Sequence, residues 1–203
     1  MRMSFRIENK YQLEVNKLSN FYKFLNDNSA NIIYPKRFIN SVYFDNQSLT
    51  AYNDSIEGVT PRKKIRIRSY PDFHNLKKIK KFNLEIKINS VEGKFKINQN
   101  DIDFQKIVKN GYHDSSYGLC FPNVEVSYFR EYFSVLNVRI TLDTSIVYKE
   151  FSKKKIIPYN KSIIVEVKSN NLDNNNHIED KIHFQKIRFS KYCNAIESVN
   201  DLF

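Results

Sequence analysis

The sequence contains little of what builds several common classes of protein. Its only two cysteines, Cys120 and Cys193, form no Cys-x-x-Cys pair, so there is neither a zinc signature nor a disulfide framework. Four glycines and five prolines in 203 residues exclude collagen-like and linker-like chains. No apolar run approaches the roughly 20 residues of a transmembrane helix, and the first residues are too charged for a signal peptide. We therefore expect a cytoplasmic protein without a membrane span.

Acidic residues are also in short supply. The chain has 33 Lys and Arg against 22 Asp and Glu, a formal net charge of +11. Hydrophobic residues make up 41% of it, so a sizeable core is still available. The length suits one domain, which we expect to span residues 1–203. The positive balance predicts an anionic partner, which could be nucleic acid, a phosphate compound or an acidic membrane surface.

Strand-like segments dominate the chain. Eight of them have β-branched or aromatic residues at alternate positions and a turn-forming residue nearby. They are Phe5 to Val15, Arg37 to Phe44, Arg62 to Tyr70, Lys80 to Ile88, Gly93 to Ile97, Val124 to Phe133, Asn137 to Tyr148 and Ser162 to Ser169. Helical spacing appears in residues 16–25, in residues 100–111 and in the tail from Ser190, while the Asn-rich run 170–176 is expected to be a loop. The sequence predicts a mainly β (α+β) domain with peripheral helices, whose antiparallel sheet is closed or nearly closed.

Charged side chains occupy one face of these predicted strands. In "RKKIRIRSY", Lys64, Arg66 and Arg68 alternate with Ile65 and Ile67, and residues of the same parity share a face of a strand. Six other segments repeat the arrangement. Their charged or polar faces carry Arg6, Glu8 and Lys10; Glu85 and Lys87; Lys94 and Lys96; Tyr128 and Arg130; Arg139 and Asp143; and Glu166 and Lys168. A sheet with one wet face gives alternation by itself, but here Arg recurs, and its planar fork suits phosphate oxygens.

These faces have a common explanation if the sheet closes with them inward. Like charges then converge, and a bound polyanion relieves both their repulsion and their desolvation. Carboxylates that recur two residues from a lysine, at Glu8, Glu85 and Glu166, would hold a divalent cation, Mg²⁺ or Mn²⁺, against phosphate oxygens. RNA binding is an alternative for a basic barrel. Because many Tyr and Phe residues take the apolar parity of their strands, we expect no nucleic acid.

Short motifs in a fixed order make the chain similar to a known family. The motifs are "ENKY" at 8–11, "SVYFDNQSLTAY" at 41–52, "KIRIRSY" at 64–70, "LEIKIN" at 84–89, "YFREYF" at 128–133, "VRITLD" at 138–143, "VEVK" at 165–168 and "FSKY" at 189–192. Each alone is weak, but the ordered set is specific and covers nearly the whole chain. The chain resembles the VTC domain of polyphosphate polymerases, in the triphosphate tunnel metalloenzyme superfamily. Arg6 stands where related triphosphatases often have a glutamate, which favours the VTC branch.

The resemblance implies an eight-stranded, closed antiparallel β-barrel that binds triphosphate or polyphosphate in its lumen with a divalent metal, Mn²⁺ or Mg²⁺. It implies that the residues stabilising the transferred group are Arg66, Arg68, Arg130 and Arg139. It implies that the residues holding neighbouring phosphates are Lys10, Lys87, Lys96, Tyr128, Lys168, Ser190 and Lys191, with Lys94 as the alternative to Lys96. It implies Glu166 as the main metal ligand, with Glu8 and Glu85 less securely tied to the metal.

The expected activity is metal-dependent phosphoryl transfer, with ATP-dependent synthesis of polyphosphate as the preferred reaction. Such transfer needs alignment and charge neutralisation more than covalent help from the protein. Two alternatives stay open at this stage. One is a triphosphatase on the same scaffold, with Glu85 or Glu8 as the base. The other is a non-catalytic module that binds polyphosphate.

Overall fold

The computed structural model describes residues 7–71, 82–153, 155–159, 163–169, 172–181 and 184–200. Arg6 and the expected first residues of three strands, Phe5, Lys80 and Ser162, lie outside these ranges. No helix in the described ranges combines the length and the apolar character needed to cross a bilayer.

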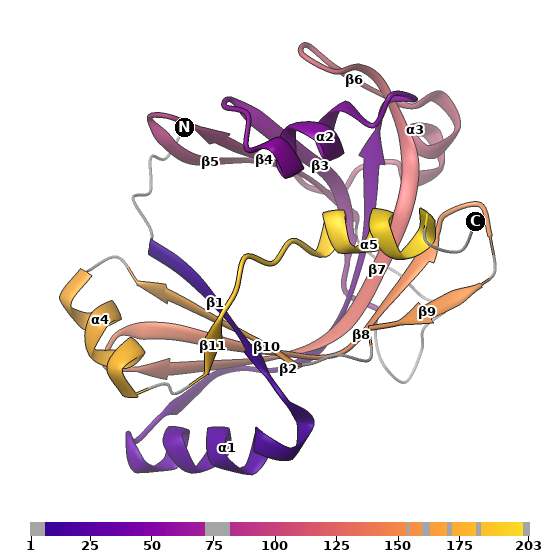
Figure 1. Ribbon diagram of the computed structural model, residues 1–203. Coiled ribbons are helices and arrows are strands. Elements are labelled where there is room, and N and C mark those ends of the chain that lie inside the picture. The colour runs from indigo at the N-terminus through magenta and orange to yellow at the C-terminus, as the bar shows by residue number, and fades with distance from the viewer. Residues whose placement is uncertain are drawn as a thin grey trace.

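Antiparallel strands dominate the structure, as the alternation predicts (Figure 1). The strands are β1 (Ile7–Leu13), β2 (Asn31–Asp45), β3 (Arg62–Ser69), β4 (Phe82–Ser90), β5 (Gly93–Gln99), β6 (Tyr112–Asp114), β7 (Gly118–Val135), β8 (Val138–Glu150), β9 (Ile156–Pro158), β10 (Ile163–Ser169) and β11 (Gln185–Lys186). The helices are a short 3₁₀ turn (Val15–Lys17), α1 (Leu18–Asp27), α2 (Thr50–Glu57), α3 (Phe104–Asn110), α4 (Leu172–Lys181) and α5 (Lys191–Asn200). Eight strands overlap the eight expected segments, and β6, β9 and β11 are too short to show an alternating pattern.

The expectation of a closed, eight-stranded barrel is wrong. The sheet has 11 strands, and its main path runs β11-β1-β10-β8-β7-β2-β3-β4-β5 with open edges at β5 and β11. β11 pairs with Tyr11 and Gln12 of β1, and the Ile187 amide donates to the Lys10 carbonyl. The outer edge of β1, which a closing strand would need, is therefore already used. Alternation identifies the residues that share a face, whereas closure depends on the tilt and stagger of the strands.

Two helices differ from the sequence expectation. Residues 170–176 were expected to be a loop, but α4 begins at Leu172. Asn is only a modestly poor helix former, and Ile178 of α4 is fully buried against the sheet, so tertiary packing outweighs local preference. The second helix, α2, was not predicted. Its first amides donate to side chains at the end of β2, including Ala51 N to Asp45 Oδ1 (3.0 Å) and Thr50 N to Asn46 Oδ1 (3.0 Å).

Two apolar clusters pack against different parts of the sheet. One contains α1 and α4 packed on β1, β7, β8 and β10. The other contains α5 with the far ends of β2, β3, β7 and β8. Phe133 and Tyr128 of β7 have opposite parity and belong to different clusters. Figure 1 shows the result: α5 lies inside the curve of the sheet, and α1 lies outside it.

We predict that Phe21→Ala lowers the free energy of unfolding by about 3–5 kcal/mol, because it removes a large buried ring. Phe21 is fully buried, and its ring packs against Phe133 at 6.1 Å between centroids. Chemical denaturation measures the loss. Lys23→Ala, at an exposed position of the same helix, is the matched control and should change stability by about 0.5 kcal/mol or less. Equal effects of the two substitutions would show that α1 is not docked as described.

Candidate functional site

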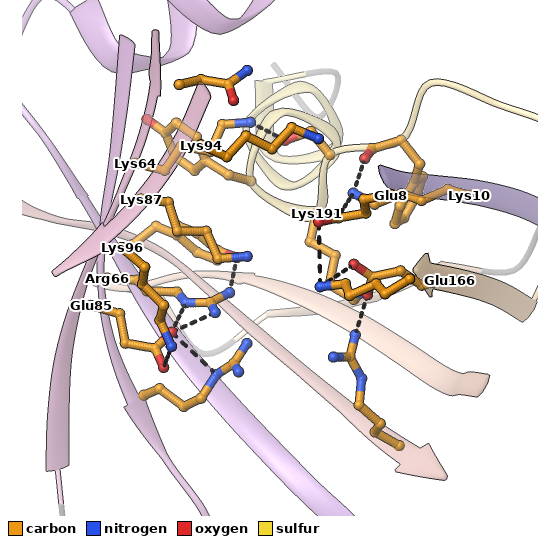
Figure 2. Close-up of a pocket in the computed structure, with 18 of the residues that line it drawn as sticks. Glu8, Lys10, Lys64, Arg66, Glu85, Lys87, Lys94, Lys96, Glu166 and Lys191 are labelled. Carbon is orange, nitrogen blue, oxygen red and sulfur yellow. Dashed lines mark hydrogen bonds and ion pairs between the residues drawn. The ribbon is translucent and has the colours of Figure 1, made fainter. Parts of the chain in front are cut away.

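The concave face of the sheet encloses a cavity of about 1080 Å³. Thirteen Lys and Arg side chains line it, but only three Glu side chains do. Positive charge is therefore concentrated in this cavity. Figure 2 shows side chains that reach into this space from opposite walls. The structure brings all fourteen predicted site residues to this one cavity: Glu8, Lys10, Arg66, Arg68, Glu85, Lys87, Lys96, Tyr128, Arg130, Arg139, Glu166, Lys168, Ser190 and Lys191.

The pairing of β3, β4 and β5 places three lysines in one row. Lys64 is the partner of Lys87 in the register, and Lys87 is the partner of Lys96. Like charges directly opposite one another destabilise a sheet. One residue pair further along, Arg66 faces Glu85. The site therefore combines a row of ammonium groups, of which only Lys96 contacts a carboxylate among the described residues, with a neighbouring row in which charge is balanced.

Glu85 is the centre of the balanced row. Its carboxylate accepts hydrogen bonds from Arg66 Nε (2.8 Å) and Lys96 Nζ (2.7 Å), and Arg68 Nε lies 4.0 Å away. Burial by itself would raise the pKa of this carboxyl. The charges of Arg66 and Arg68 outweigh burial and hold the pKa of Glu85 far below its usual value. Glu85 is thus a fixed anion that orients two guanidinium groups.

Asp143 plays the same part on the opposite wall. Arg130 forms a bidentate pair with it, Nε to Oδ1 at 2.5 Å and Nη2 to Oδ2 at 2.6 Å, and Lys191 Nζ approaches Oδ2 at 2.5 Å. Asp143 is fully buried within β8. Although burial favours its neutral form, Arg130 and Lys191 lower its pKa. The carboxylate therefore fixes two cations of the cavity.

Six of the thirteen cavity cations have no carboxylate within 4.0 Å in the part of the chain that the structure describes. They are Arg37, Arg62, Lys64, Lys87, Lys94 and Arg139. Arg139 is the clearest case, since its Nε is buried and has no hydrogen-bond partner among the described residues. An unpaired buried donor is costly, and an anion in the cavity would satisfy it.

Comparison with known proteins gives this arrangement a family. A family model described as the VTC domain matches residues 5–115 and 98–200. The chain belongs to the VTC domain family. A search of curated proteins found no match.

Solved structures share the fold of this VTC domain at low identity. A proposed adenylate cyclase from Vibrio parahaemolyticus is 12% identical, with a TM-score of 0.61 over 97% of this chain and 99% of that one. The PH1819 protein of Pyrococcus horikoshii is 13% identical, with a TM-score of 0.61 over 95% and 99%. A proposed adenylyl cyclase from Hippeastrum, described as having a dominant triphosphatase activity, is 12% identical, with a TM-score of 0.54 over 95% and 94%.

The carboxylates that were expected to bind metal lie in two places in this VTC domain. Glu8 and Glu166 sit on the paired strands β1 and β10, and both approach Lys168 Nζ, at 3.3 and 2.7 Å. Glu85 belongs to the opposite wall, as Figure 2 shows. No group of three or more potential ligands among His, Cys, Asp and Glu occurs in the described residues. Two carboxylates next to phosphate oxygens nevertheless suit Mg²⁺, which commonly takes one or two protein carboxylates.

Sequence reasoning missed several residues that line the cavity. Tyr43 stacks on Tyr192 at 5.1 Å between centroids, and its hydroxyl also accepts a hydrogen bond from Arg66 Nη1 (3.1 Å). Arg37 shares the parity of Tyr43 but was overlooked because Ile39 and Ser41, the residues of that parity between them, carry no charge and mark no charged face. In the β4–β5 hairpin, parity did not decide between Lys94 and Lys96 as the site residue. Both side chains line the cavity.

Lys87 projects into the cavity from the middle of the lysine row and remains exposed to solvent there. Its pKa lies well below the usual value for lysine, chiefly because of the charge of Arg66 and also because of desolvation. Since its exposure argues against full desolvation, we attribute the lowered pKa mainly to like charge. Desolvation and the nearby Lys10 likewise lower the pKa of Lys64.

These lowered pKa values predict the behaviour of Lys87→Met. The unfolded chain binds more protons than the folded chain between the folded pKa and about 10.4, so stability rises with pH in that range. Removing one ammonium from the row should raise the free energy of unfolding at neutral pH by about 1 kcal/mol and flatten its rise towards about pH 9. Denaturant titrations across that range test this, with exposed Lys23→Met as the matched control. A destabilised Lys87→Met protein with an unchanged pH slope would contradict the assignment.

Proposed function

We propose that this VTC domain is a phosphotransferase that holds the triphosphate of ATP in the cationic cavity and extends a polyphosphate chain. A terminal oxygen of the acceptor chain attacks the γ-phosphorus, the bond from that phosphorus to the β–γ bridging oxygen breaks, and ADP leaves. The observation that carries the proposal is the convergence of thirteen cationic side chains on one cavity with only three glutamates. A linear polyanion is the ligand that such a field favours.

The two kinds of cation suit different parts of this reaction. Arg66 and Arg130 are buried and held by carboxylates, so their remaining donors are oriented before the ligand arrives. Preorganised donors of this kind stabilise charge that develops during transfer. Arg139 and Lys87, which have no acidic partner among the described residues, are free to bind phosphate oxygens directly. Arg68, whose Nη2 donates to the Tyr128 hydroxyl at 3.1 Å, extends the oriented group.

Lys64 on β3 and Lys10 on β1, which lie on opposite walls of the cavity, complete the proposed phosphate-binding surface. Ser190 receives a hydrogen bond from Lys64 Nζ (2.8 Å), and Lys10 Nζ donates to the Phe189 carbonyl (2.7 Å). The segment that carries Ser190 and Lys191 is thereby tied to both walls. Glu8 and Glu166 would hold a divalent cation, which would neutralise charge on the bound phosphates.

Hydrolysis of triphosphate is the second candidate, and the likeness to the Hippeastrum protein supports it. One of the two bases considered for it fits poorly. Glu85 is engaged by Arg66 and Lys96, and its pKa is strongly lowered, so it would take a proton from water only weakly. Glu8, which pairs with Lys168 at 3.3 Å, remains the carboxylate for that reaction. A module that binds polyphosphate without turnover is the third reading.

Incubation of the protein with ATP and Mg²⁺ or Mn²⁺ distinguishes these readings. Long chains on a polyphosphate gel, with release of ADP, are the expected result. Orthophosphate without chains would identify a triphosphatase instead. Tight binding of polyphosphate with no turnover under either metal would identify a binding module.

Arg139→Gln should lower kcat/KM for ATP by about 100-fold, because it removes a guanidinium that is free to bind phosphate oxygens directly. The fold should survive, because this guanidinium has no carboxylate partner among the described residues that would be left uncompensated. Steady-state kinetics with ATP measure the effect, and a thermal melt checks folding. Lys23→Gln is the control for loss of one positive charge. A folded Arg139→Gln protein with the control's rate would remove Arg139 from the proposed machinery.

A further inference from the structure

Arg37 stands apart from the other cations of the cavity because aromatic rings surround it. Its guanidinium carbon lies 5.0 Å from the centroid of Tyr34, 5.7 Å from that of Tyr132 and 5.9 Å from that of Tyr70. Arg37 is exposed, as are Tyr34 and Tyr70, while all four side chains line the cavity. The group therefore forms an exposed rim of the cavity, which we call the tyrosine rim: Tyr34, Arg37, Tyr70 and Tyr132.

The rim holds the guanidinium without neutralising it. A cation–π contact engages the flat face of the guanidinium, whereas the N–H donors of arginine point outward in its plane. No carboxylate lies within 4.0 Å of Arg37 in the part of the chain that the structure describes. Arg37 thus keeps both its full charge and its donors for a ligand.

The register adds a reason for an anion at this point. Arg37 is the partner of Arg130 in the β2–β7 pairing, and opposed like charges are unfavourable. The donors of Arg130 are engaged by Asp143 and Glu166, the latter at 3.2 Å. Arg37 has no such compensation among the described residues. One phosphate group at the rim would supply it, through the bidentate geometry that guanidinium and phosphate share.

We propose that the tyrosine rim is an additional anion subsite, which binds a phosphate group of a linear polyphosphate where the chain extends beyond the three phosphates held deeper in the cavity. This inference rests on the proposed function and adds to it a preference for chains longer than triphosphate. Lys64, Lys87 and Arg139 belong to β3, β4 and β8, whereas the rim belongs to β2, β7 and the residue that follows β3. A ligand that contacts both groups spans more of the cavity than one that contacts the first group alone.

Binding measurements on the whole chain test the subsite. Arg37→Gln removes the charge and keeps most of the length, and Arg37→Lys keeps the charge but loses the planar fork. Lys36→Gln is the matched control, because Lys36 pairs with Glu131 (3.3 Å) and is not among the cavity-lining residues. Each protein is titrated calorimetrically with tripolyphosphate, with a longer linear polyphosphate of defined length and with ATP.

The expected result is selective. Arg37→Gln should weaken binding of the longer chain by about tenfold, in keeping with loss of one charge-assisted hydrogen bond, and should leave tripolyphosphate affinity at the level of Lys36→Gln. Arg37→Lys should recover part of the loss. Equal affinities of Arg37→Gln and Lys36→Gln for the longer chain would overturn the proposal. A loss confined to ATP would also overturn it, since the rim would then bind the nucleoside by stacking.

The same titrations separate this inference from the proposed function. If the unsubstituted protein binds neither tripolyphosphate nor the longer chain, the proposed function fails and the subsite fails with it. If it binds both and Arg37→Gln behaves as the control does, the proposed function stands and the subsite alone is rejected.

Discussion

Repulsion between like charges is the constraint on which the rest of the structure depends. Lys64, Lys87 and Lys96 are register partners across three strands, and like charges at opposed positions destabilise a sheet. The fold compensates only in part, because Glu85 and Asp143 each fix two or more cations. The opposite faces of β3 and β4 bury the apolar side chains of Ile65, Ile67, Leu84 and Ile86. Burial on that outer face offsets a cavity that is unfavourable until an anion occupies it, and any ligand that binds only the folded chain will stabilise it further.

The buried carboxylates and the free cations have different consequences for the ligand. A guanidinium paired with Glu85 or Asp143 is oriented, but part of its charge is already balanced. Lys87 and Arg139, without such partners among the described residues, present their full charge in less constrained positions. In the proposed function, binding strength would therefore come mainly from the second set and orientation from the first. In the proposed reaction, this division would let one cavity attract a polyanion strongly and still align a single phosphorus atom within it.

Alternation in the sequence predicts strands and the face to which each side chain belongs, but it does not predict how the edges of the sheet pair. Period-two patterns identified eight strands and the face to which Arg66, Arg130 and Glu166 belong, because parity survives errors of a few residues at strand ends. The pattern contains no information on which strands meet at the edges, so the two-residue strand β11 and the open sheet were not foreseen. α4 was missed because Ile178 packs against residues distant in sequence. Arg37 was missed because the residues that share its parity in β2, Ile39 and Ser41, carry no charge, so alternation showed no charged face there.

The open edge has its own consequence for the site. Since β5 does not pair with β1, the wall between them is made by chain segments that follow β11. There Lys10 holds the Phe189 carbonyl, and Lys64 holds Ser190. Tyr192 anchors the segment by stacking on Tyr43 and by donating a hydrogen bond to Asp45, whose carboxylate also accepts the first amides of α2. At this wall, side-chain contacts thus replace the strand-to-strand hydrogen bonds of a closed barrel. Lys10 and Lys64 both hold this wall in place and contribute positive charge to the cavity. An anion that draws them inward would therefore alter the hydrogen bonds of the wall as well as neutralise charge.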